Sequence, residues 1–178
     1  ITTEDDLNRW CEEILKQKFF AIDTETTSLD TLSAELVGIS LCIGIGKACY
    51  IPVAHKANQP EHSDLEEEQL DRDMVLRRLQ PLLLDESILK IGHNIKYDIK
   101  VLYKYSCYVN SFDDTMLMSH CINGGRQRHS LDAIAKDLLN HETIKLKDLI
   151  GSGKKELNFK NVPISLAADY AAEDADMT

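Results

Sequence analysis

The sequence predicts an α/β fold built on a mixed β-sheet, in a single domain that spans residues 1–178. Three strand-like segments near the N-terminus are joined by short polar turns, which is typical of antiparallel neighbours. Helical and strand-like segments then alternate, and helices alone complete the chain, a pattern that indicates a sheet covered by helices. The 178 residues are 43% hydrophobic and 28% charged, which is ordinary for a globular domain with its own core.

The N-terminal half begins with a predicted helix and three predicted strands. Residues 3–17 start with a capping-box-like Thr3 and continue with apolar side chains at helical spacing. An apolar run from Phe19 then forms the first strand. The further elements expected in this half are strands over 35–43 and 47–53, a polar surface loop over 54–64, and a helix over 66–84 that Pro81 bends or ends.

The C-terminal half alternates strand-like and helical segments before it becomes wholly helical. A fourth strand is expected over 87–91, and Gly92 starts a helix that reaches about Tyr105. The remaining expected elements are an edge strand over 107–112, a helix capped by Asp113 or Asp114 through Cys121, a loop over 122–129, a helix over 131–139 capped by Ser130, a basic segment over 144–150, and a last helix from Ile164 after Pro163. The loop over 151–155 lacks the spacing of a phosphate-binding P-loop.

The charge of the chain is strongly acidic and unevenly distributed. The net charge is −10, and residues 1–89 contain 18 acidic and 8 basic side chains, whereas residues 90–178 contain 12 of each. Affinity for nucleic acid comes largely from the neutralisation of phosphates, so this balance argues against a non-specific nucleic-acid-binding domain. We expect any nucleic acid to be held locally, through metal ions and a few bases, and single-stranded ends to be bound weakly.

The sequence carries no membrane-spanning or targeting signal. No apolar run approaches the ~20 residues that a membrane span requires, and the start lacks the pattern of a signal peptide, so no membrane partner is expected. The five cysteines form no C-x-x-C pair, and most lie in apolar patterns, which predicts buried thiols in a reducing compartment such as the cytosol. Because Ile1 is not an initiator and Thr178 stops a helical pattern, we expect a part of a longer chain.

Two carboxylates follow the apolar run of the first strand. Asp23 and Glu25 are spaced i, i+2, so the period of a strand places them on the same face. Like charges this close raise one pKa unless a cation intervenes, and a bound divalent metal ion resolves the conflict. The alternative is a strand that exits into solvent with two solvated acids, because D-x-E is a weak motif on its own.

Two further acids lie at the ends of predicted elements. Asn94 and Asp98 are spaced i, i+4 on the helix after the fourth strand, and Tyr170 and Asp174 share this spacing on the last helix, where alanines leave room for close approach. The alternatives are a favourable acid at a helix start and a core tyrosine beside a solvated acid. Together with the carboxylates of the first strand, these acids supply the hard oxygen ligands of a two-metal site, and the absence of histidine and cysteine ligands disfavours zinc.

These motifs resemble a known group of nucleases over nearly the whole chain. Asp23-Thr-Glu25, Asn94-x-Lys-Tyr-Asp98 and Tyr170-x-x-x-Asp174 are similar to the three exonuclease motifs of the DEDDy family. Tyr50-Ile-Pro-Val-Ala-His55, Asp114-Thr-Met116 and the segment 170–176 resemble the 3′–5′ proofreading domain of bacterial family A DNA polymerase I. The resemblance implies a ribonuclease H-like fold with a five-stranded sheet in the order 3-2-1-4-5, three strands antiparallel and the rest parallel, flanked by helices.

The resemblance also implies a catalytic set and its cofactors. Asp23, Glu25 and Asp174 would hold one metal ion, and Asp23 would bridge to a second ion that Asp98 holds mainly through water. Tyr170 would orient the attacking water together with Glu25. The two ions would be Mg²⁺ or Mn²⁺, with Zn²⁺ able to occupy one site in vitro. The reaction implied is hydrolysis of the 3′-terminal phosphodiester, which releases nucleoside 5′-monophosphates.

Five further residues match substrate-binding positions of the family. Leu29 matches a leucine that wedges against the terminal bases, whereas Asn94 and Lys96 match contacts to the DNA backbone. Arg128 and Leu146 match a substrate-facing arginine and a phenylalanine that stacks on a base, and leucine stacks less well than an aromatic ring. For the two leucines, ordinary packing is the alternative. His129 is a lone histidine, for which a structural role is expected.

The partners implied by the resemblance are single-stranded DNA 3′ ends and the polymerase domain of the same chain. The domain itself is expected to be monomeric and to act in the bacterial cytoplasm, at the nucleoid. One rival interpretation is a free-standing RNA exonuclease related to ribonuclease D, which shares the acids but not the segments 26–29 and 51–55. A second rival is a catalytically silent domain that only supports a polymerase, although no motif acid is missing.

Overall fold

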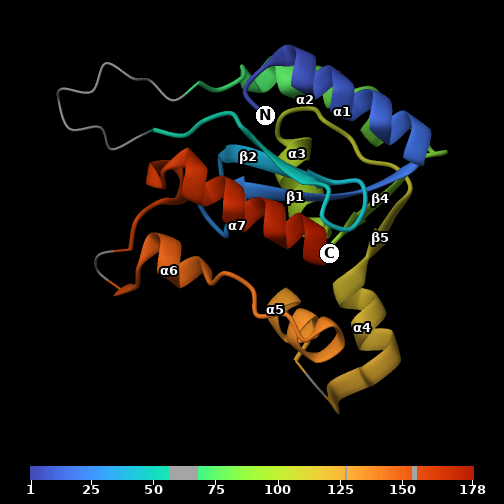
Figure 1. The fold of residues 1–178 in the computed structure, drawn as a ribbon, viewed down its shortest axis with the longest axis vertical. Coiled ribbons are helices and arrows are strands. Elements are labelled where there is room, and N and C mark those ends of the chain that lie inside the picture. The colour runs from blue at the N-terminus through green and yellow to red at the C-terminus, as the bar shows by residue number, and fades with distance from the viewer. Residues whose placement is uncertain (57–67, 127, 154–155) are drawn as a thin grey trace.

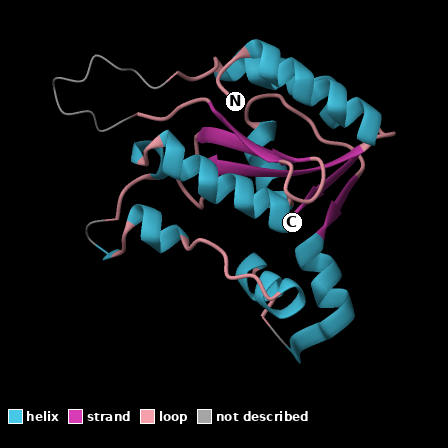
Figure 2. Ribbon diagram, viewed as in Figure 1, coloured by secondary structure: helices cyan, strands magenta, loops and turns pink. Residues whose placement is uncertain are grey.

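The fold is a mixed five-stranded sheet between two unequal layers of helices (Figure 1). The computed structural model describes residues 1–56, 68–126, 128–153 and 156–178. Figure 2 shows the strands as one continuous twisted layer with helices on both sides. The strands are β1 (Phe19–Thr26), β2 (Leu36–Cys42), β3 (Ala48–Pro52), β4 (Leu89–Gly92) and β5 (Phe112–Asp114).

The strand order is β3-β2-β1-β4-β5, so the predicted ribonuclease H-like topology is confirmed. β1 pairs antiparallel with β2, and β2 pairs antiparallel with β3, as their short connections predict. β1 pairs parallel with β4, and β4 pairs parallel with β5. The central strand β1 is therefore the point at which the strand order reverses, where ligands collect in open α/β sheets.

One face of the sheet holds the main hydrophobic core beneath α1, α2 and α3. These helices span Glu4–Gln17, Arg72–Leu84 and Lys96–Tyr103. Their buried side chains pack against Phe20 and Ile22 of β1 and against Ile39 and Leu41 of β2. Alternate residues of a strand point to opposite faces, so this packing turns the odd-numbered residues of β1 toward the other face.

The second face of the sheet is covered by α7 (Ile164–Met177), which lies across the strands (Figure 1). Its buried side chains are Ala167, Ala171 and Ala175, which recur every four residues along one side of the helix. Small side chains let two elements approach closely, as the alanines of the sequence predict. This close approach brings the residues of α7 next to those of β1.

The first part of the segment between β5 and α7 projects away from the sheet with α4 and α5, whereas its last residues return to the sheet before α7 (Figure 1). The whole segment contains α4 (Thr115–Asn123), η1 (Gly124–Arg126), α5 (Leu131–Ile134), η2 (Ala135–Leu139), α6 (Leu146–Ile150) and η4 (Phe159–Asn161). Ser130 caps α5, as predicted, but the expected helix over 131–139 is α-helical only to Ile134 and continues as a π-helix. Ala135 is buried, but Leu138 and Leu139 are exposed, so the C-terminal part of the apolar side of this helix is not buried as its pattern predicts.

The predicted helix over 66–84 begins later than expected. α2 begins at Arg72, because the Asp71 carboxylate accepts a hydrogen bond from the Met74 amide at 2.8 Å and caps the helix. Pro81 does not end the helix, which continues to Leu84. Most of the expected polar loop over 54–64 lies outside the described residues.

The helix expected from Gly92 also begins later, at Lys96. Asn94 has φ = 62°, a left-handed conformation that asparagine tolerates, and its backbone amide donates to Asp114 Oδ1 at 3.0 Å. Asn94 therefore precedes the helix, and the prediction that Asn94 and Asp98 share one helix face is wrong.

The edge strand expected over 107–112 is instead formed by Phe112–Asp114. The preceding residues pair with α2, since the Gln80 side chain bonds both the amide and the carbonyl of Tyr108. The Asn110 amide also donates to the Leu83 carbonyl at 2.9 Å. These contacts occupy the backbone groups that a longer strand would need for pairing.

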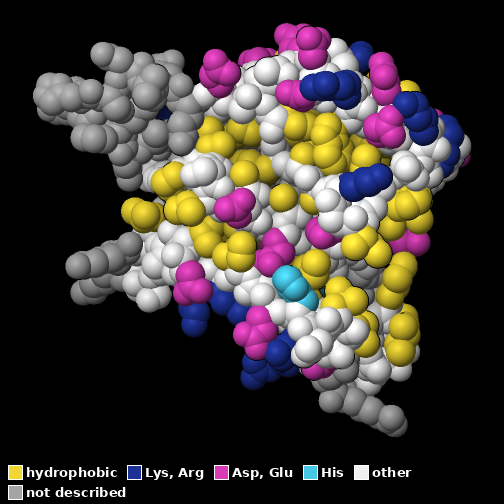
Figure 3. Space-filling view, in the orientation of Figure 1, with side chains coloured by type: hydrophobic (Ala, Val, Ile, Leu, Met, Phe, Trp, Pro, Cys, Tyr) yellow, Lys and Arg dark blue, Asp and Glu magenta, His cyan; other side chains and the backbone are white. Residues whose placement is uncertain are grey.

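The burial of the cysteine thiols and the distribution of surface charge resemble what the sequence predicts. Cys11, Cys42 and Cys107 are buried free thiols, whereas Cys121 is exposed. On the face shown in Figure 3, lysine and arginine side chains form separate small groups among acidic ones instead of one continuous basic surface. Within the described part of the chain, no helix has the length and apolar character needed to span a membrane.

Candidate active site

Three of the predicted metal-binding acids converge between β1 and α7. Asp23 and Glu25 lie on the face of the sheet that α7 covers, and Asp174 extends from α7 toward them. Carboxylate oxygens of these three residues lie within 4.8 Å of one another. Residues separated by about 150 positions in the sequence thus form one acidic cluster, as the motif spacing predicts.

The fourth acid, Asp98, lies beside the cluster and is fixed by the backbone of β1. The pairing between β1 and β4 ends at Ala21, so the next amides of β1 face α3 instead of a strand. Asp98 Oδ1 accepts hydrogen bonds from the Thr24 amide at 3.0 Å and the Thr24 hydroxyl at 2.5 Å. Asp98 is 2% exposed, and these bonds satisfy a carboxylate that water barely reaches.

Tyr170 lies one helical turn before Asp174 on the same side of α7. Its side chain lies beside the Asp174 carboxylate and lowers the pKa of that carboxyl group against the larger effect of burial, so the two residues are neighbours, as i, i+4 spacing predicts. Burial, followed by the negative charge of Asp174, raises the pKa of Tyr170. The side chain therefore remains a phenol at neutral pH and can donate a proton in a hydrogen bond.

All four acids are poorly suited to carry their charges without a cation. Burial raises the pKa of Asp23 well above its ordinary value, and the neighbouring carboxylates raise it further. Burial and the charge of Asp174 likewise raise the pKa of Glu25. Burial raises the pKa of Asp98 to about 7 and that of Asp174 to about 6. Desolvation and mutual repulsion thus oppose full ionisation of the cluster.

In the absence of metal ions, the folded protein should lose stability as pH rises from about 4 to 7. Asp98 holds its proton to about pH 7 in the folded chain, whereas an aspartate in the unfolded chain releases it near its ordinary pKa. The stability from this proton is fully present below the unfolded pKa and is lost as pH rises through the folded pKa. Melting temperatures measured in EDTA should therefore fall over this range, less steeply in Asp98→Asn, and an equal slope in both proteins would contradict the prediction.

The donor set of the cluster fits a hard divalent cation. Asp23, Glu25 and Asp174 offer carboxylate oxygens, the ligands that Mg²⁺ and Mn²⁺ prefer, and no histidine or cysteine belongs to this group. A cation among these oxygens offsets the repulsion that raises their pKa values. The residues present therefore fit a divalent metal ion.

The acids open into a cleft of about 570 Å³. Its lining includes all five predicted catalytic residues and three of the predicted substrate-binding residues, Leu29, Asn94 and Leu146. Leu29 is 91% exposed and Leu146 is 38% exposed, so both leucines present apolar surface to the cleft instead of packing in the core. The cleft is thus polar at the acids and apolar at its rim.

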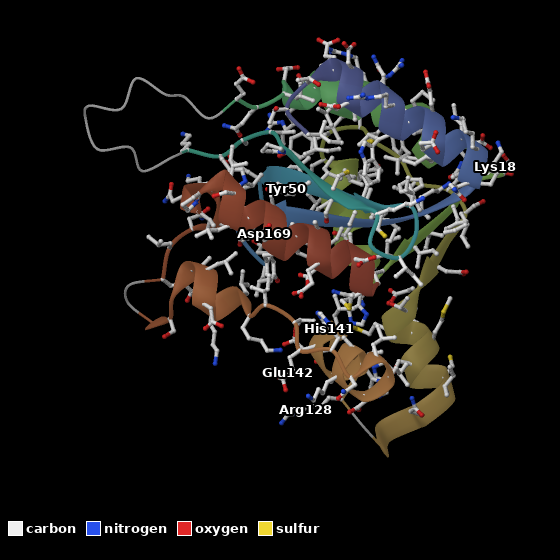
Figure 4. The ribbon with its side chains drawn as sticks, in the orientation of Figure 1. Lys18, Tyr50, Arg128, His141, Glu142 and Asp169 are labelled. Atoms are coloured by element: carbon white, nitrogen blue, oxygen red, sulfur yellow. The ribbon has the colours of Figure 1, made fainter. Side chains whose placement is uncertain are left out.

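The other two predicted substrate-binding residues do not line this cleft. Lys96 is exposed, and its ammonium group donates to the Asn94 side chain. Arg128 is exposed on the loop beside α5, away from the sheet (Figure 4). His129 bonds Ser119 Oγ at 2.9 Å and the Gly124 carbonyl at 2.7 Å, contacts that hold the α4–α5 connection together as the expected structural role requires.

Several residues of the site have no short-range signal in the sequence. The Tyr97 hydroxyl donates to the Ser28 carbonyl at 2.5 Å and holds the loop that carries Leu29. The side-chain amide of Asn158 donates to the Thr27 carbonyl at 2.9 Å and fixes the other side of the same loop. In the sequence, only the position of Tyr97 next to Asp98 indicates a role in the site, because the remaining contacts depend on the tertiary fold.

Glu173 connects α7 to the chain that precedes α6. Its carboxylate accepts from the Ile144 amide at 2.6 Å and is paired with His141 Nε2 at 2.8 Å. Figure 4 places His141 just beyond α7, on the segment between α5 and α6. Glu173 therefore holds the segment that leads to Leu146 against the helix that carries Asp174.

The chain matches known sequences along its whole length. A family described as 3′–5′ exonuclease matches residues 1–178. DNA polymerase I of Pseudomonas aeruginosa is 42% identical over 173 residues, which are 95% of this chain and 18% of that protein. DNA polymerase I of Rhizobium leguminosarum is 41% identical over 183 residues, covering 97% of this chain and again 18% of the relative. The chain thus spans about one fifth of the length of these relatives.

Solved structures share the fold at lower identity. Escherichia coli RNase D, an exoribonuclease involved in structured RNA processing, is 22% identical with a TM-score of 0.68, and the match covers 99% of this chain and 41% of RNase D. Brucella melitensis NrnC with bound Mg²⁺ is 24% identical with a TM-score of 0.63, covering 89% of this chain and 67% of NrnC. A further NrnC structure, bound to pGG, has the same identity and TM-score. From the match along its whole length, this chain belongs to the 3′–5′ exonuclease domain family of DNA polymerase I.

Proposed function

We propose that this domain removes nucleotides from the 3′ end of single-stranded or frayed DNA by metal-dependent hydrolysis, and so proofreads DNA synthesis during replication and repair. The observation that carries the proposal is the convergence of three carboxylates within 4.8 Å at the base of a cleft. Asp98 and Tyr170 lie beside them. Catalysis of phosphoryl transfer rests on positioning and charge stabilisation, and this group of residues can supply both.

Two divalent ions, Mg²⁺ or Mn²⁺, are proposed as cofactors, with Zn²⁺ able to occupy one site in vitro. Asp23, Glu25 and Asp174 would hold one ion, and Asp23 and Asp98 would hold the second. When bound, such ions lower the pKa of water and stabilise the charge that develops on the phosphate. The Mg²⁺ in the NrnC structure, which has the same fold, supports a divalent cation in this type of site.

Side chains of the protein itself orient the water that attacks the phosphate. The phenol of Tyr170 and the carboxylate of Glu25 orient the attacking water. The water oxygen forms a bond to phosphorus while the bond between phosphorus and the 3′-oxygen of the preceding nucleotide breaks. The terminal nucleotide leaves as a 5′-monophosphate, and the shortened strand ends in a new 3′-hydroxyl. A hydrogen bond from the Tyr170 hydroxyl to the neighbouring Asp174 carboxylate would keep the hydroxyl aligned.

The strand is proposed to lie along the apolar rim of the cleft. Leu29 would wedge against the terminal bases, Leu146 would pack against a base, and Asn94 would contact the backbone near the acids. Lys96 and Arg128, which lie outside the lining, would contact the strand further from the cleavage point. The pGG bound in an NrnC structure supports a nucleic-acid ligand for the fold.

The setting of the domain is part of the proposal. A polymerase domain in the same longer chain would supply frayed 3′ ends and most of the affinity for DNA, since this domain has a net charge of −10. Residues 1–178 would form a single exonuclease domain, which would be monomeric in isolation. The buried free thiols fit action in the reducing cytoplasm of a bacterium, at the nucleoid.

A digestion assay tests the proposal and separates it from its rivals. Single-stranded DNA labelled at the 5′ end should be shortened from the 3′ end in Mg²⁺ or Mn²⁺ but not in EDTA, and not by Asp23→Ala. Faster digestion of a matched RNA would favour a ribonuclease D-like enzyme instead, because the substrates differ at the 2′-hydroxyl. No digestion, together with no binding of Mn²⁺, would identify a catalytically silent domain.

A further inference from the structure

Tyr50 packs against β2 at the point where β2 pairs with the catalytic strand. Gly38 is the partner of Glu25 in the antiparallel pairing of β1 and β2. A Cβ atom at Gly38 would lie 2.0 Å from the Tyr50 hydroxyl, so the tyrosine occupies the space above the glycine. Tyr50 is 3% exposed and lies on the face of the sheet that carries Asp23 and Glu25. Figure 4 shows Tyr50 at the edge of the sheet beside α7.

The Tyr50 hydroxyl starts a buried chain of hydrogen bonds that ends at the entrance to α7. The hydroxyl lies 2.7 Å from His55 Nε2, and His55 Nδ1 lies 3.0 Å from the Val162 carbonyl oxygen. A carbonyl only accepts, so Nδ1 carries a proton and donates it. In the neutral imidazole Nε2 is then the acceptor, and the Tyr50 hydroxyl donates to it. All three groups are buried, so water does not compete for these bonds.

The same contacts reach Tyr170 through the segment that precedes α7. The Lys56 amide donates to the Lys160 carbonyl at 2.6 Å, beside the bond from His55 to Val162. The Phe159 ring lies 5.9 Å from the His55 ring and 6.2 Å from the Tyr170 ring, measured between centroids. An uninterrupted line of contacts therefore connects β3 to the phenol in the cleft.

We propose that Tyr50 and His55 are positioning residues of the hydrolytic reaction. Their hydrogen bonds hold the segment 159–162 on the sheet and thereby fix where α7 begins and where the Tyr170 hydroxyl lies. The fully buried side chains of α7 are all alanines, and small side chains resist sliding of the helix weakly. The hydrogen bonds from Tyr50 to His55 and from His55 to Val162 restrict this sliding. This inference rests on the proposed function, since it assigns a position to the phenol that orients the water.

The primary test compares Tyr50→Phe with Tyr108→Phe in the digestion assay. Tyr50→Phe removes one buried hydroxyl and keeps the ring above Gly38, whereas Tyr108 is an exposed tyrosine outside the lining of the cleft. We expect Tyr50→Phe to lower kcat about tenfold without a matching change in KM, as expected for loss of one positioning contact, and Tyr108→Phe to be unchanged.

A double-mutant cycle separates positioning from general destabilisation. If Tyr50 acts through Tyr170, adding Tyr50→Phe to Tyr170→Phe should lower kcat less than twofold, because the hydroxyl that it positions is already gone. An equal tenfold loss in both backgrounds would overturn the proposal. So would a kcat for Tyr50→Phe equal to that of the wild type.

Two measurements do not depend on activity. Amide hydrogen exchange of residues 159–171 should be faster in Tyr50→Phe, and faster still in His55→Leu, which removes both hydrogen bonds. His55→Asn, which keeps a donor near the Nδ1 position for the Val162 carbonyl, should lie between them. The affinity for Mn²⁺ should remain within twofold, since the metal-binding carboxylates are untouched. Unchanged exchange would overturn the proposal that Tyr50 and His55 hold the segment 159–162. An inactive wild type with changed exchange would refute only the proposed function, and the structural role of Tyr50 and His55 would remain supported.

Discussion

Replacement of Asp174 or Asp23 by asparagine is expected to slow hydrolysis of the 3′-terminal phosphodiester by about a thousandfold or more. Each change removes one of three carboxylates whose oxygens lie within 4.8 Å of one another, and an amide carries no charge with which to hold a divalent cation. Single-turnover digestion of 5′-labelled DNA at saturating enzyme would measure the chemical step. The bound fraction of the DNA should change much less than the rate.

Asp169→Asn provides a matched control on the same helix. Asp169 is one turn before Glu173, is exposed, and points away from the sheet (Figure 4). Its removal should leave the rate within about twofold, because it is not part of the cleft lining. A similar loss of rate in Asp169→Asn and Asp174→Asn would contradict the assignment of Asp174 as a metal ligand and would indicate a general effect on α7.

Gly38→Ala, which adds a single methyl group, is expected to lower the free energy of unfolding by about 2–3 kcal/mol. The new methyl group would meet the Tyr50 ring and hydroxyl at 2.0–2.4 Å, and both residues are confined within the sheet. The ring cannot withdraw without breaking its hydrogen bond to His55. Urea denaturation followed by circular dichroism would measure the change in the midpoint.

Two companion variants test whether this loss arises from the contact with Tyr50. Gly125→Ala should be nearly neutral, because a Cβ at that position meets no atom within 4 Å. In the double variant Gly38→Ala/Tyr50→Ala the two losses should be less than additive by about 1 kcal/mol or more, since the clash no longer exists. Additive losses would show that Gly38 acts through something other than Tyr50.

The sequence predicts this site well where the signal is periodic or local. The i, i+2 spacing of Asp23 and Glu25 places both on one face because strand geometry has no freedom to do otherwise. The i, i+4 spacing of Tyr170 and Asp174 likewise places both side chains next to each other in the lining of the cleft. Asn94 is different, because its left-handed conformation is set by a bond to Asp114, twenty residues later, which no local pattern reveals.

Long-range contacts also explain the other errors. The strand expected over 107–112 is displaced because Gln80 captures the backbone of Tyr108. The side chains of Leu138 and Leu139 have helical spacing but find no apolar surface within the described part of this domain, so they remain exposed. The Tyr50–His55–Val162 chain joins residues up to 112 positions apart, and the sequence shows only its first two members close together.

The distribution of the site along the chain has a consequence for its biosynthesis. The ribosome makes Asp23 and Glu25 early, but Tyr170 and Asp174 are added only about 150 residues later. Because α7 covers the sheet on its acidic face, the central strand must wait for this late helix before its charged side is enclosed. A nascent chain therefore exposes an incomplete acidic strand, and the proposed nuclease activity should begin only after α7 has left the ribosome.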